Sequence, residues 1–151
     1  MLFRSLYFSG VSILTIGYGD IVPESRFLKM LVLLDPEFYH IPMLWLGGAV
    51  KQPMKIDKIM NQTDLAATLL GQLGIDHSSF IFSRNVLGSD YTYPFAFYSF
   101  NNGFSFRDST GVTVFDNNSE SILLEEPVGS EQRINKGKAI LQSVYDDLGR
   151  R

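Results

Sequence analysis

The stretch that decides the fold is Tyr39–Ile75, which reads YHIPMLWLGGAVKQPMKIDKIMNQTDLAATLLGQLGI. Within it, Ile41–Leu46 is a short apolar run that ends at two glycines, which is typical of a strand buried on both faces. Residues 61–64 are rich in helix N-cap types, and leucines recur at helical spacing over Asp64–Leu73. Gly74 stands where a helix commonly ends in a left-handed residue. The stretch predicts a central strand and a helix packed on the sheet, as in a layered α/β domain.

Beyond this unit the hydrophobic period changes to two, which is typical of strands. Turn-forming residues separate four expected strands, at Phe95–Phe100, Gly103–Arg107, Val112–Phe115 and Ser121–Leu124. A last helix is predicted over Ser130–Leu148, with Ser130 as its N-cap and Gly149 as its end. Its expected apolar stripe consists of Ile134, Leu141, Val144, Tyr145 and Leu148. Together these patterns predict an antiparallel meander with a helix across one face.

Two motifs of this region resemble the sulfatase and alkaline-phosphatase-like superfamily, in particular its lipoteichoic-acid-synthase-like and phosphoethanolamine-transferase-like branches. The first is His40-Ile41-Pro42-Met43, and the second is the run Gln62–Ile75 with Gln62, Asp64, Leu65, Thr68, Leu69, Leu70, Leu73, Gly74 and Ile75 in matching positions. The later FAFYSFNNGFSFRD also fits the C-terminal strands of that family. The resemblance covers residues 36–151. It implies an α/β fold with an α+β C-terminal part: a partial alkaline-phosphatase-like sheet, an antiparallel meander and a C-terminal helix.

The same resemblance implies, for a full-length member, a Thr, Ser or Cys-derived nucleophile and a divalent metal held by carboxylates and histidine. Those elements belong upstream of the first motif, and residues 1–36 contain no Asp-His pair. The pair Asp76-His77 follows the helix, which is the wrong place for a ligand. No catalytic residue and no metal ligand is therefore assigned, and whether the chain is an enzyme is left undecided. The expected function is a fragment of a metal-dependent hydrolase or transferase of sulfate esters, phosphoglycerol or phosphoethanolamine, inactive alone.

A different resemblance lies in residues 6–23, LYFSGVSILTIGYGDIVP. The run Thr15, Ile16, Gly17, Tyr18, Gly19 and Asp20 resembles the selectivity filter of potassium channels, preceded by a pore helix at 6–14 and followed by the start of an inner helix at 25–34. The resemblance implies that the backbone carbonyls of residues 15–18 and the Thr15 hydroxyl replace the hydration shell of a potassium ion. Gly17 and Gly19 permit the required backbone angles, and Asp20 lies at the outer mouth.

The alternative function is accordingly that of a potassium-channel pore protein, with potassium as its ion. A conducting pore needs four filters held by spanning helices of about 20 apolar residues each. The apolar run Phe27–Leu34 is interrupted by Lys29 and stops before Asp35. This part therefore reads as a fragment of a pore. A third hypothesis, a non-catalytic α/β module, also remains.

Composition excludes several classes of function. A net charge of −3 and a pI of about 5.3 give no basic footprint for nucleic acid. The absence of cysteine excludes disulfides and thiolate metal sites, and two histidines are too few for a histidine-rich metal site. No convincing signal peptide is present. Membrane association is possible through residues 6–34, and both resemblances suggest a bacterial membrane or its periplasmic side.

The two resemblances divide the chain into a pore-loop-like part, residues 1–35, and a sulfatase-like part, residues 36–151. No Gly, Ser or Pro linker separates them near Leu34–Glu37, although natural fusions usually have one. Residues 1–5 match neither family. A chimeric reading frame is the favoured interpretation and an evolved fusion is the alternative. The oligomeric state stays open.

Four further residues or runs have a structural and a functional interpretation. His40 is expected to be packed or hydrogen-bonded rather than a metal ligand. Asp64 is expected to charge the first helical turn rather than to bind a metal. The basic residues Lys51, Lys55 and Lys58 are expected to lie in a solvated connection rather than near a substrate anion. The apolar run Phe80–Phe82 is expected to anchor its connection on the core.

Overall fold

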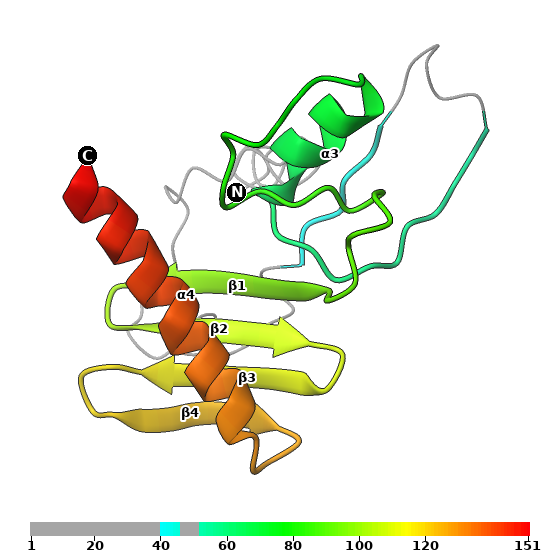
Figure 1. Ribbon diagram of the computed structural model, residues 1–151. Coiled ribbons are helices and arrows are strands. Elements are labelled where there is room, and N and C mark those ends of the chain that lie inside the picture. The colour runs from blue at the N-terminus through cyan, green and yellow to red at the C-terminus, as the bar shows by residue number, and fades with distance from the viewer. Residues whose placement is uncertain (1–39, 46–51) are drawn as a thin grey trace, which may run out of the picture. The chain divides into compact units, whose positions relative to one another are not determined.

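The computed structural model describes residues 40–45 and 52–151, and the chain divides into two units, residues 1–55 and 56–151. The expected domain boundary at residues 35–36 lies outside the described residues. The second unit contains, in chain order, the elements α3 (Asp64–Gln72), β1 (Phe95–Phe100), β2 (Gly103–Asp108), β3 (Gly111–Asp116), β4 (Ser121–Glu126) and α4 (Glu131–Arg150) (Figure 1). These elements form an α+β arrangement.

The predicted central strand at Ile41–Leu46 is wrong over residues 41–45, which have no regular secondary structure; Leu46 lies outside the described residues. Ile41, Met43 and Leu44 are between 43% and 77% exposed, so the run is not buried. The sheet of the described residues is built instead from hairpins between consecutive strands, in the order β1-β2-β3-β4. An apolar run becomes a buried strand only when neighbouring strands take up its backbone groups, and none does so here.

The antiparallel meander is confirmed, with two-residue turns joining β1 to β2 and β2 to β3. Cross-strand partners lie on the same face of a sheet. The register pairs Phe97 with Phe106 and Phe104 with Phe115, which gathers these rings on one face. Their centroids are spaced by less than 6 Å, with Phe97 on Phe104 and Phe104 on Phe115. The aromatic residues therefore pack within the fold, as the sequence predicts.

The helix α4 lies across this aromatic face, running diagonally over the sheet in Figure 1. It begins where the sequence predicts, because the Ser130 hydroxyl accepts a hydrogen bond from the Arg133 amide at 3.3 Å. Ile134, Ile140 and Leu141 pack against the buried aromatic cluster. Gly149 does not end the helix, which continues to Arg150, because an exposed glycine lowers helix stability without terminating a helix.

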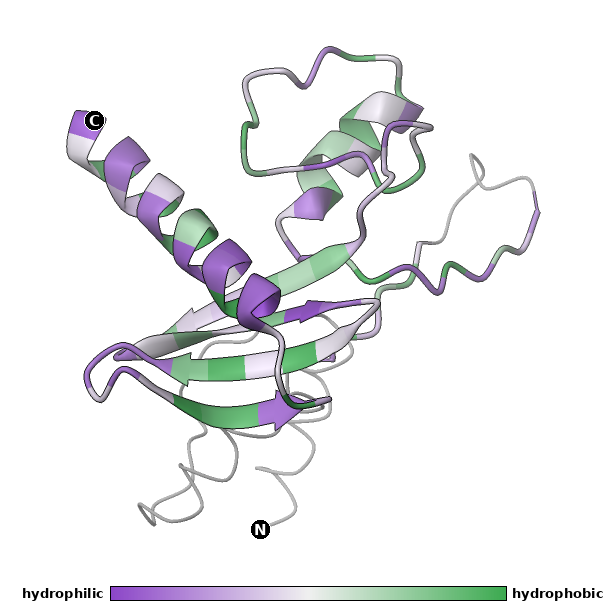
Figure 2. Cartoon of the chain, turned by 60° about the horizontal axis from the view of Figure 1, so that its bottom comes forward, coloured by the Kyte–Doolittle hydropathy of each residue, from purple (hydrophilic) through white to green (hydrophobic). Residues whose placement is uncertain are grey.

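Only the first half of the predicted α4 stripe is covered, and only in part: Ile134 and Leu141 are partly buried against the aromatic cluster. Val144, Tyr145 and Leu148 are 40%, 60% and 68% exposed, so the stripe becomes exposed toward the C-terminal end of the helix. In Figure 2 most of α4 has the hydrophilic colour, whereas the strands carry much of the hydrophobic colour. Hydrophobic spacing alone thus marks the correct face of the helix but overstates how much of it is covered.

The helix α3 matches its predicted range within one residue. Its C-terminal glycine is also confirmed: Gly74 has a φ of +67°, and the Ile75 amide donates to the Leu70 carbonyl at 2.9 Å, as in a Schellman motif. The buried residues of α3, however, are Asp64, Ala67 and Thr68, not the leucines. The expectation that this helix packs on the sheet is wrong, because its buried residues contact residues 83–86 instead.

Candidate functional site

The six filter-like residues, Thr15, Ile16, Gly17, Tyr18, Gly19 and Asp20, lie outside the residues that the structure describes. In the 56–151 unit, charged and hydrogen-bonding side chains gather in three places. These are a buried network beside α4, a carboxylate–arginine pair at the start of α3, and a depression under the middle of α4.

The centre of the network beside α4 is Arg133, whose side chain is only 2% exposed. Its Nε donates to the Thr113 hydroxyl at 2.8 Å, and its Nη1 donates to the Thr110 carbonyl at 3.1 Å. Its Nη2 donates to the Pro127 carbonyl and lies 3.5 Å from Glu125 Oε1. The planar guanidinium therefore connects β3, the β2–β3 turn and the segment after β4 through the fixed fork that only arginine presents.

Glu125 completes this centre. Its carboxylate accepts hydrogen bonds from the backbone amides of Gly129 at 2.7 Å and Ser130 at 3.0 Å. These bonds order the connection into α4. The Gly129 and Ser130 hydrogen bonds, together with the charge of Arg133, hold the pKa of Glu125 below its ordinary value despite burial. The carboxylate is thus kept charged opposite the buried arginine.

The outer part of the network is formed by Tyr93, Asp108 and Lys136. The Tyr93 hydroxyl donates to Asp108 Oδ2, and Lys136 Nζ donates to the Tyr93 oxygen at 2.6 Å. Asp108 Oδ1 accepts the amide and the hydroxyl of Thr110 at 2.8 and 2.5 Å. Thr110 therefore links this part to Arg133, and the network is continuous from Tyr93, two positions before β1, to α4.

The titration of this part follows from its hydrogen bonds. Burial raises the pKa of Asp108, but the hydrogen bonds from Thr110 and Tyr93 and the charge of Lys136 outweigh it, so the pKa is lowered. Burial, followed by the hydrogen bond to Asp108, raises the pKa of Tyr93. A tyrosine held neutral at neutral pH is a hydrogen-bond donor rather than a nucleophile, which favours a structural role.

We expect stability to fall as the pH is lowered below about 4. Because the folded-state pKa of Asp108 lies below its ordinary value of 3.8, the unfolded chain binds this proton more readily. The stabilisation is present above the unfolded pKa and is lost as pH falls through the folded one. Urea midpoints measured between about pH 6 and pH 3 test this. The control Asp108→Asn should give a shallower decline; an unchanged pH dependence in that variant would contradict the assignment.

The second place is Asp64, which is fully buried at the start of α3. Its Oδ2 accepts the Asn61 amide at 2.8 Å, and its Oδ1 accepts the Arg84 amide at 2.9 Å. The Arg84 guanidinium binds both carboxylate oxygens, with Nη2 2.5 Å from Oδ2 and Nε 3.0 Å from Oδ1. The expectation that Asp64 serves the first helical turn is met in part, because the carboxylate is also one half of a bidentate ion pair.

This pair is attached to the outer edge of the sheet. Arg84 Nη2 donates to the Phe95 carbonyl at 2.9 Å, and the Arg84 guanidinium lies 3.7 Å from the centre of the Phe95 ring. The Asn61 side-chain oxygen accepts the Phe97 amide at 2.6 Å. Two side chains thus occupy alternate backbone groups along the free edge of β1, where another strand would otherwise bind.

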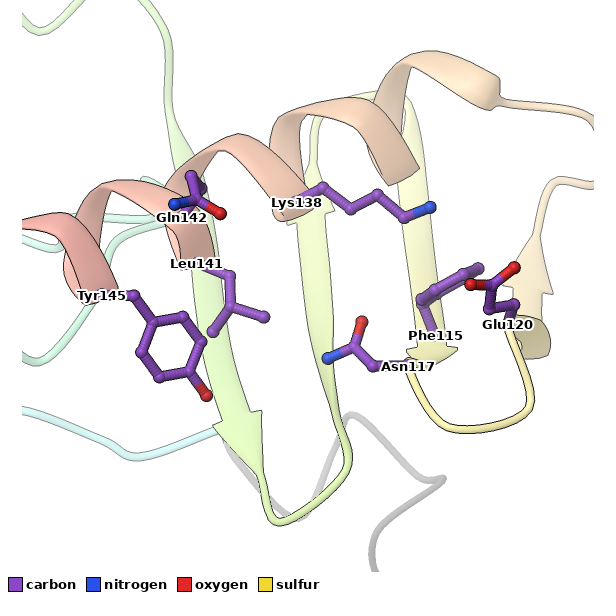
Figure 3. Close-up of a pocket in the computed structure, with 7 residues that line it drawn as sticks. All are labelled: Phe115, Asn117, Glu120, Lys138, Leu141, Gln142 and Tyr145. Carbon is purple, nitrogen blue, oxygen red and sulfur yellow. The ribbon is translucent and has the colours of Figure 1, made fainter.

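The third place is an open depression of about 390 Å³ between α4 and the β3–β4 turn (Figure 3). Its lining residues are Phe115, Asn117, Glu120, Lys138, Leu141, Gln142 and Tyr145. Lys138 Nζ lies 4.5 Å from the centre of the Phe115 ring, so this cation is held over the aromatic floor. A lining of mixed polar and apolar side chains that lie mostly on the surface specifies no reaction.

The other residues singled out in the sequence have structural surroundings. His40 is exposed, so of the two expected environments, packed or hydrogen-bonded, packing is not found. Lys55 and Lys58 are both exposed, as expected for a solvated connection, and Lys58 Nζ donates to the Val86 carbonyl at 2.8 Å; Lys51 lies outside the described residues. Phe80–Phe82 is 38–66% exposed, so the expected anchoring on the core is wrong. Within residues 40–45 and 52–151, no group of three His, Asp or Glu side chains could hold a metal ion.

Sequence reasoning did not single out Arg84, Arg133 or Asp108. For Arg133 a signal exists, because it lies one turn before Gly137 and two turns before Ile140, on the inward side of the helix. A charged residue in phase with an apolar stripe points to a buried ion pair. For Arg84 no local signal exists, because its partner Asp64 lies 20 positions away.

The comparisons with known proteins bear on the N-terminal residues. A family model described as ion channel matches residues 1–34, which include the filter-like run. The match also includes residues 1–5, so the expectation that they match neither family is wrong. No curated protein and no solved structure matches the chain. The sulfatase-like resemblance of residues 36–151 receives no support from these comparisons. Among the helices of the described residues, none is long and apolar enough to cross a membrane.

Proposed function

We propose that residues 1–34 are a potassium-channel pore segment, and that the function of the chain lies in them. The observation that carries this proposal is the ion-channel match over residues 1–34, which coincides with the run Thr15–Asp20. In this role the carbonyls of residues 15–18 coordinate potassium, Gly17 and Gly19 provide the backbone angles, and Asp20 lies at the outer mouth. One chain supplies one quarter of a filter. Conduction therefore requires four copies, held by membrane-spanning helices in an assembly.

The test is to place residues 6–23 in the corresponding pore segment of a tetrameric potassium channel. We expect potassium-selective currents from the graft, because the filter residues then have the scaffold that a single chain lacks. Gly17→Val should abolish the current, since a β-branched residue cannot adopt the angles that aim the carbonyls at one axis. The matched control is Val11→Ile before the filter, which should leave selectivity unchanged. A folded graft that does not distinguish potassium from sodium would refute the proposal.

A second candidate concerns residues 36–151, which we propose to be an inactive fragment of a sulfatase-superfamily hydrolase or transferase. Its ground is the resemblance of the run Gln62–Ile75 to that superfamily, and the environment of Asp64 in this run bears on whether the fragment is inactive. Both carboxylate oxygens of Asp64 accept hydrogen bonds from the Arg84 guanidinium, and one also accepts a hydrogen bond from the Asn61 amide. A carboxylate paired in this way orders the start of α3, so we do not assign Asp64 a metal-binding role.

The expected result for Asp64→Ala is a loss of about 2–3 kcal/mol of unfolding free energy with no change in background turnover. This is less than the roughly 3–5 kcal/mol of a fully buried pair, because the Arg84 side chain is 24% exposed. The sequence alone predicts a loss of about 1 kcal/mol of unfolding free energy, the value of a helix cap. The larger figure reflects the Arg84 guanidinium, which the substitution leaves without its carboxylate. Urea unfolding gives the first quantity, and turnover of an aryl sulfate or a phosphodiester with manganese, magnesium or zinc gives the second.

The control for this variant is Asp76→Ala, which removes an exposed carboxylate that binds only within its own turn. Its cost should be within about 0.5 kcal/mol, as for most surface substitutions. Metal-dependent turnover that disappears in a folded Asp64→Ala protein would overturn the fragment interpretation and identify an enzyme.

A further inference from the structure

The turn between β1 and β2 contains the only asparagine of the chain that is followed by glycine. The turn consists of Asn101 and Asn102, which are both exposed, and Gly103 begins β2. Asparagine amides are among the heat-labile groups of proteins. Their loss is fastest before glycine, because a residue without a Cβ leaves its backbone nitrogen open to the asparagine side chain. The sequence therefore places one reactive pair in an exposed turn.

The fold requires the glycine of this pair. Gly103 is buried, and a Cβ at this position would lie 2.1 Å from the Phe115 carbonyl oxygen and 2.6 Å from Phe100 Cζ. The first of these atoms belongs to the backbone of β3, so it cannot move aside unless the strands part. The strand pairing that demands glycine at position 103 thus keeps the reactive pair in the chain.

The geometry of the turn allows the two groups to meet. Among the described residues, neither Asn101 nor Asn102 has a positive φ, so this two-residue turn is not of type I′ or II′, the types whose twist matches that of the strands. Gly103 pairs with Phe100 as the last pair of the ladder. The end of a ladder opens more readily than its interior, so the Gly103 amide is released without unfolding of the sheet.

We propose that Asn102 is a spontaneous modification site at which the folded protein forms isoaspartate. The Gly103 nitrogen attacks Asn102 Cγ, and the new N–C bond closes a cyclic imide. The Cγ–Nδ2 bond breaks, and Nδ2 leaves as ammonia with the proton of the Gly103 amide. Water then adds to either carbonyl of the imide, which gives aspartate or isoaspartate. The reaction consumes only water.

The isoaspartate product weakens the end of the sheet where two turns meet. The Asn102 carbonyl accepts a hydrogen bond from the Asn117 amide at 2.7 Å, which joins the β1–β2 turn to the β3–β4 turn at the same end of the sheet (Figure 1). In isoaspartate the main chain passes through Cβ and Cγ, and the former Asn102 carbonyl becomes a free carboxylate. Because the main chain is then longer by a carbon, this oxygen and Gly103 cannot both keep their partners.

The experiment ages the full, folded chain at mildly alkaline pH. Mass spectrometry of a digest, together with labelling by an isoaspartate-specific methyltransferase, locates the product. We expect it at Asn102, whereas Asn117 and Asn118, which are exposed but precede asparagine and serine, stay amides. The matched variant Asn102→Gln keeps the amide but needs a larger ring, so it should form no product. Equal modification at Asn117, or modification at Asn102 only in urea, would overturn the proposal.

Thermal unfolding tests the effect on the sheet. Ion exchange separates the modified chains, which carry an additional negative charge, and we expect the isoaspartate form to unfold at a lower temperature than the unmodified protein. Asn102→Asp is the control, because it adds the same charge without lengthening the main chain and should unfold with the wild type. Identical unfolding of the isoaspartate form and Asn102→Asp would overturn the weakening of the joined turns.

Discussion

Replacing Arg133 by methionine is expected to lower the free energy of unfolding by about 3–5 kcal/mol, the range for breaking a buried ion pair. Methionine fills much of the same space but donates no hydrogen bond. The Thr113 hydroxyl, the carbonyls of Thr110 and Pro127, and the Glu125 carboxylate then lose their common donor. Buried acceptors without donors carry their full desolvation cost. Urea unfolding of the whole chain, followed by far-ultraviolet circular dichroism, measures the loss.

Two controls accompany this variant. Arg150→Met changes an exposed arginine at the last turn of α4 and should cost less than about 0.5 kcal/mol. Arg133→Lys keeps the charge but loses the planar fork, so it should recover only part of the stability. If Arg133→Met unfolds at the wild-type urea concentration, the network does not hold α4 on the sheet.

Replacing Gly137 by leucine is expected to cost at least about 4 kcal/mol, a loss that only severe overpacking or a comparable defect produces. A Cβ at position 137 would meet Phe104 Cε2 at 2.0 Å and Cδ2 at 2.6 Å. The Phe104 ring is completely buried and packs on both Phe97 and Phe115, so it has no space to move into. The helix must therefore lift from the sheet or the aromatic cluster must open.

The direction of the change in unfolding free energy distinguishes close packing at Gly137 from an effect of helix propensity. In an exposed helix, exchanging glycine for leucine stabilises by about 0.5–1 kcal/mol through helix propensity. Gly149→Leu is the matched control, because a Cβ at position 149 meets nothing within 4 Å. We expect the two substitutions, twelve positions apart in one helix, to act in opposite directions. Equal effects in thermal unfolding would show that α4 does not approach the sheet closely at Gly137.

The features that the sequence predicts well are those that depend on local chemistry. The four strands follow from alternation and turn residues, and the limits of α3 and α4 follow from Gly74 and Ser130. These signals act within a few residues of one another, so no knowledge of the rest of the fold is needed. Gly149 shows the limit of such signals, because a glycine at an exposed helical position has no reason to end the helix.

The features that the sequence predicts poorly depend on distant partners. Ile41–Leu46 has the composition of a central strand, but the residues of this run that the structure describes pair with no strand. The leucines of α3 have the spacing of a buried face, yet the hydroxyl of Thr68 and the carboxylate of Asp64 decide which face is covered. Arg84 forms an ion pair with Asp64 from 20 positions away, and no local sequence pattern indicates that pairing. The filter-like run Thr15–Asp20 remains a prediction from sequence and the ion-channel match.

The side chains of Asn61 and Arg84 bind backbone groups of β1, so the two edges of the sheet differ in how accessible they are to another strand. On the β1 side, the Phe97 amide and the Phe95 carbonyl are already taken, so an incoming strand would have to displace a bidentate ion pair and an amide oxygen. On the β4 side, within the described residues, the sheet simply stops, next to the exposed Ile122 and Leu123. Within the described residues, a further strand would therefore meet less resistance at the β4 edge than at the β1 edge. A charged residue at the exposed position 123 would oppose such pairing.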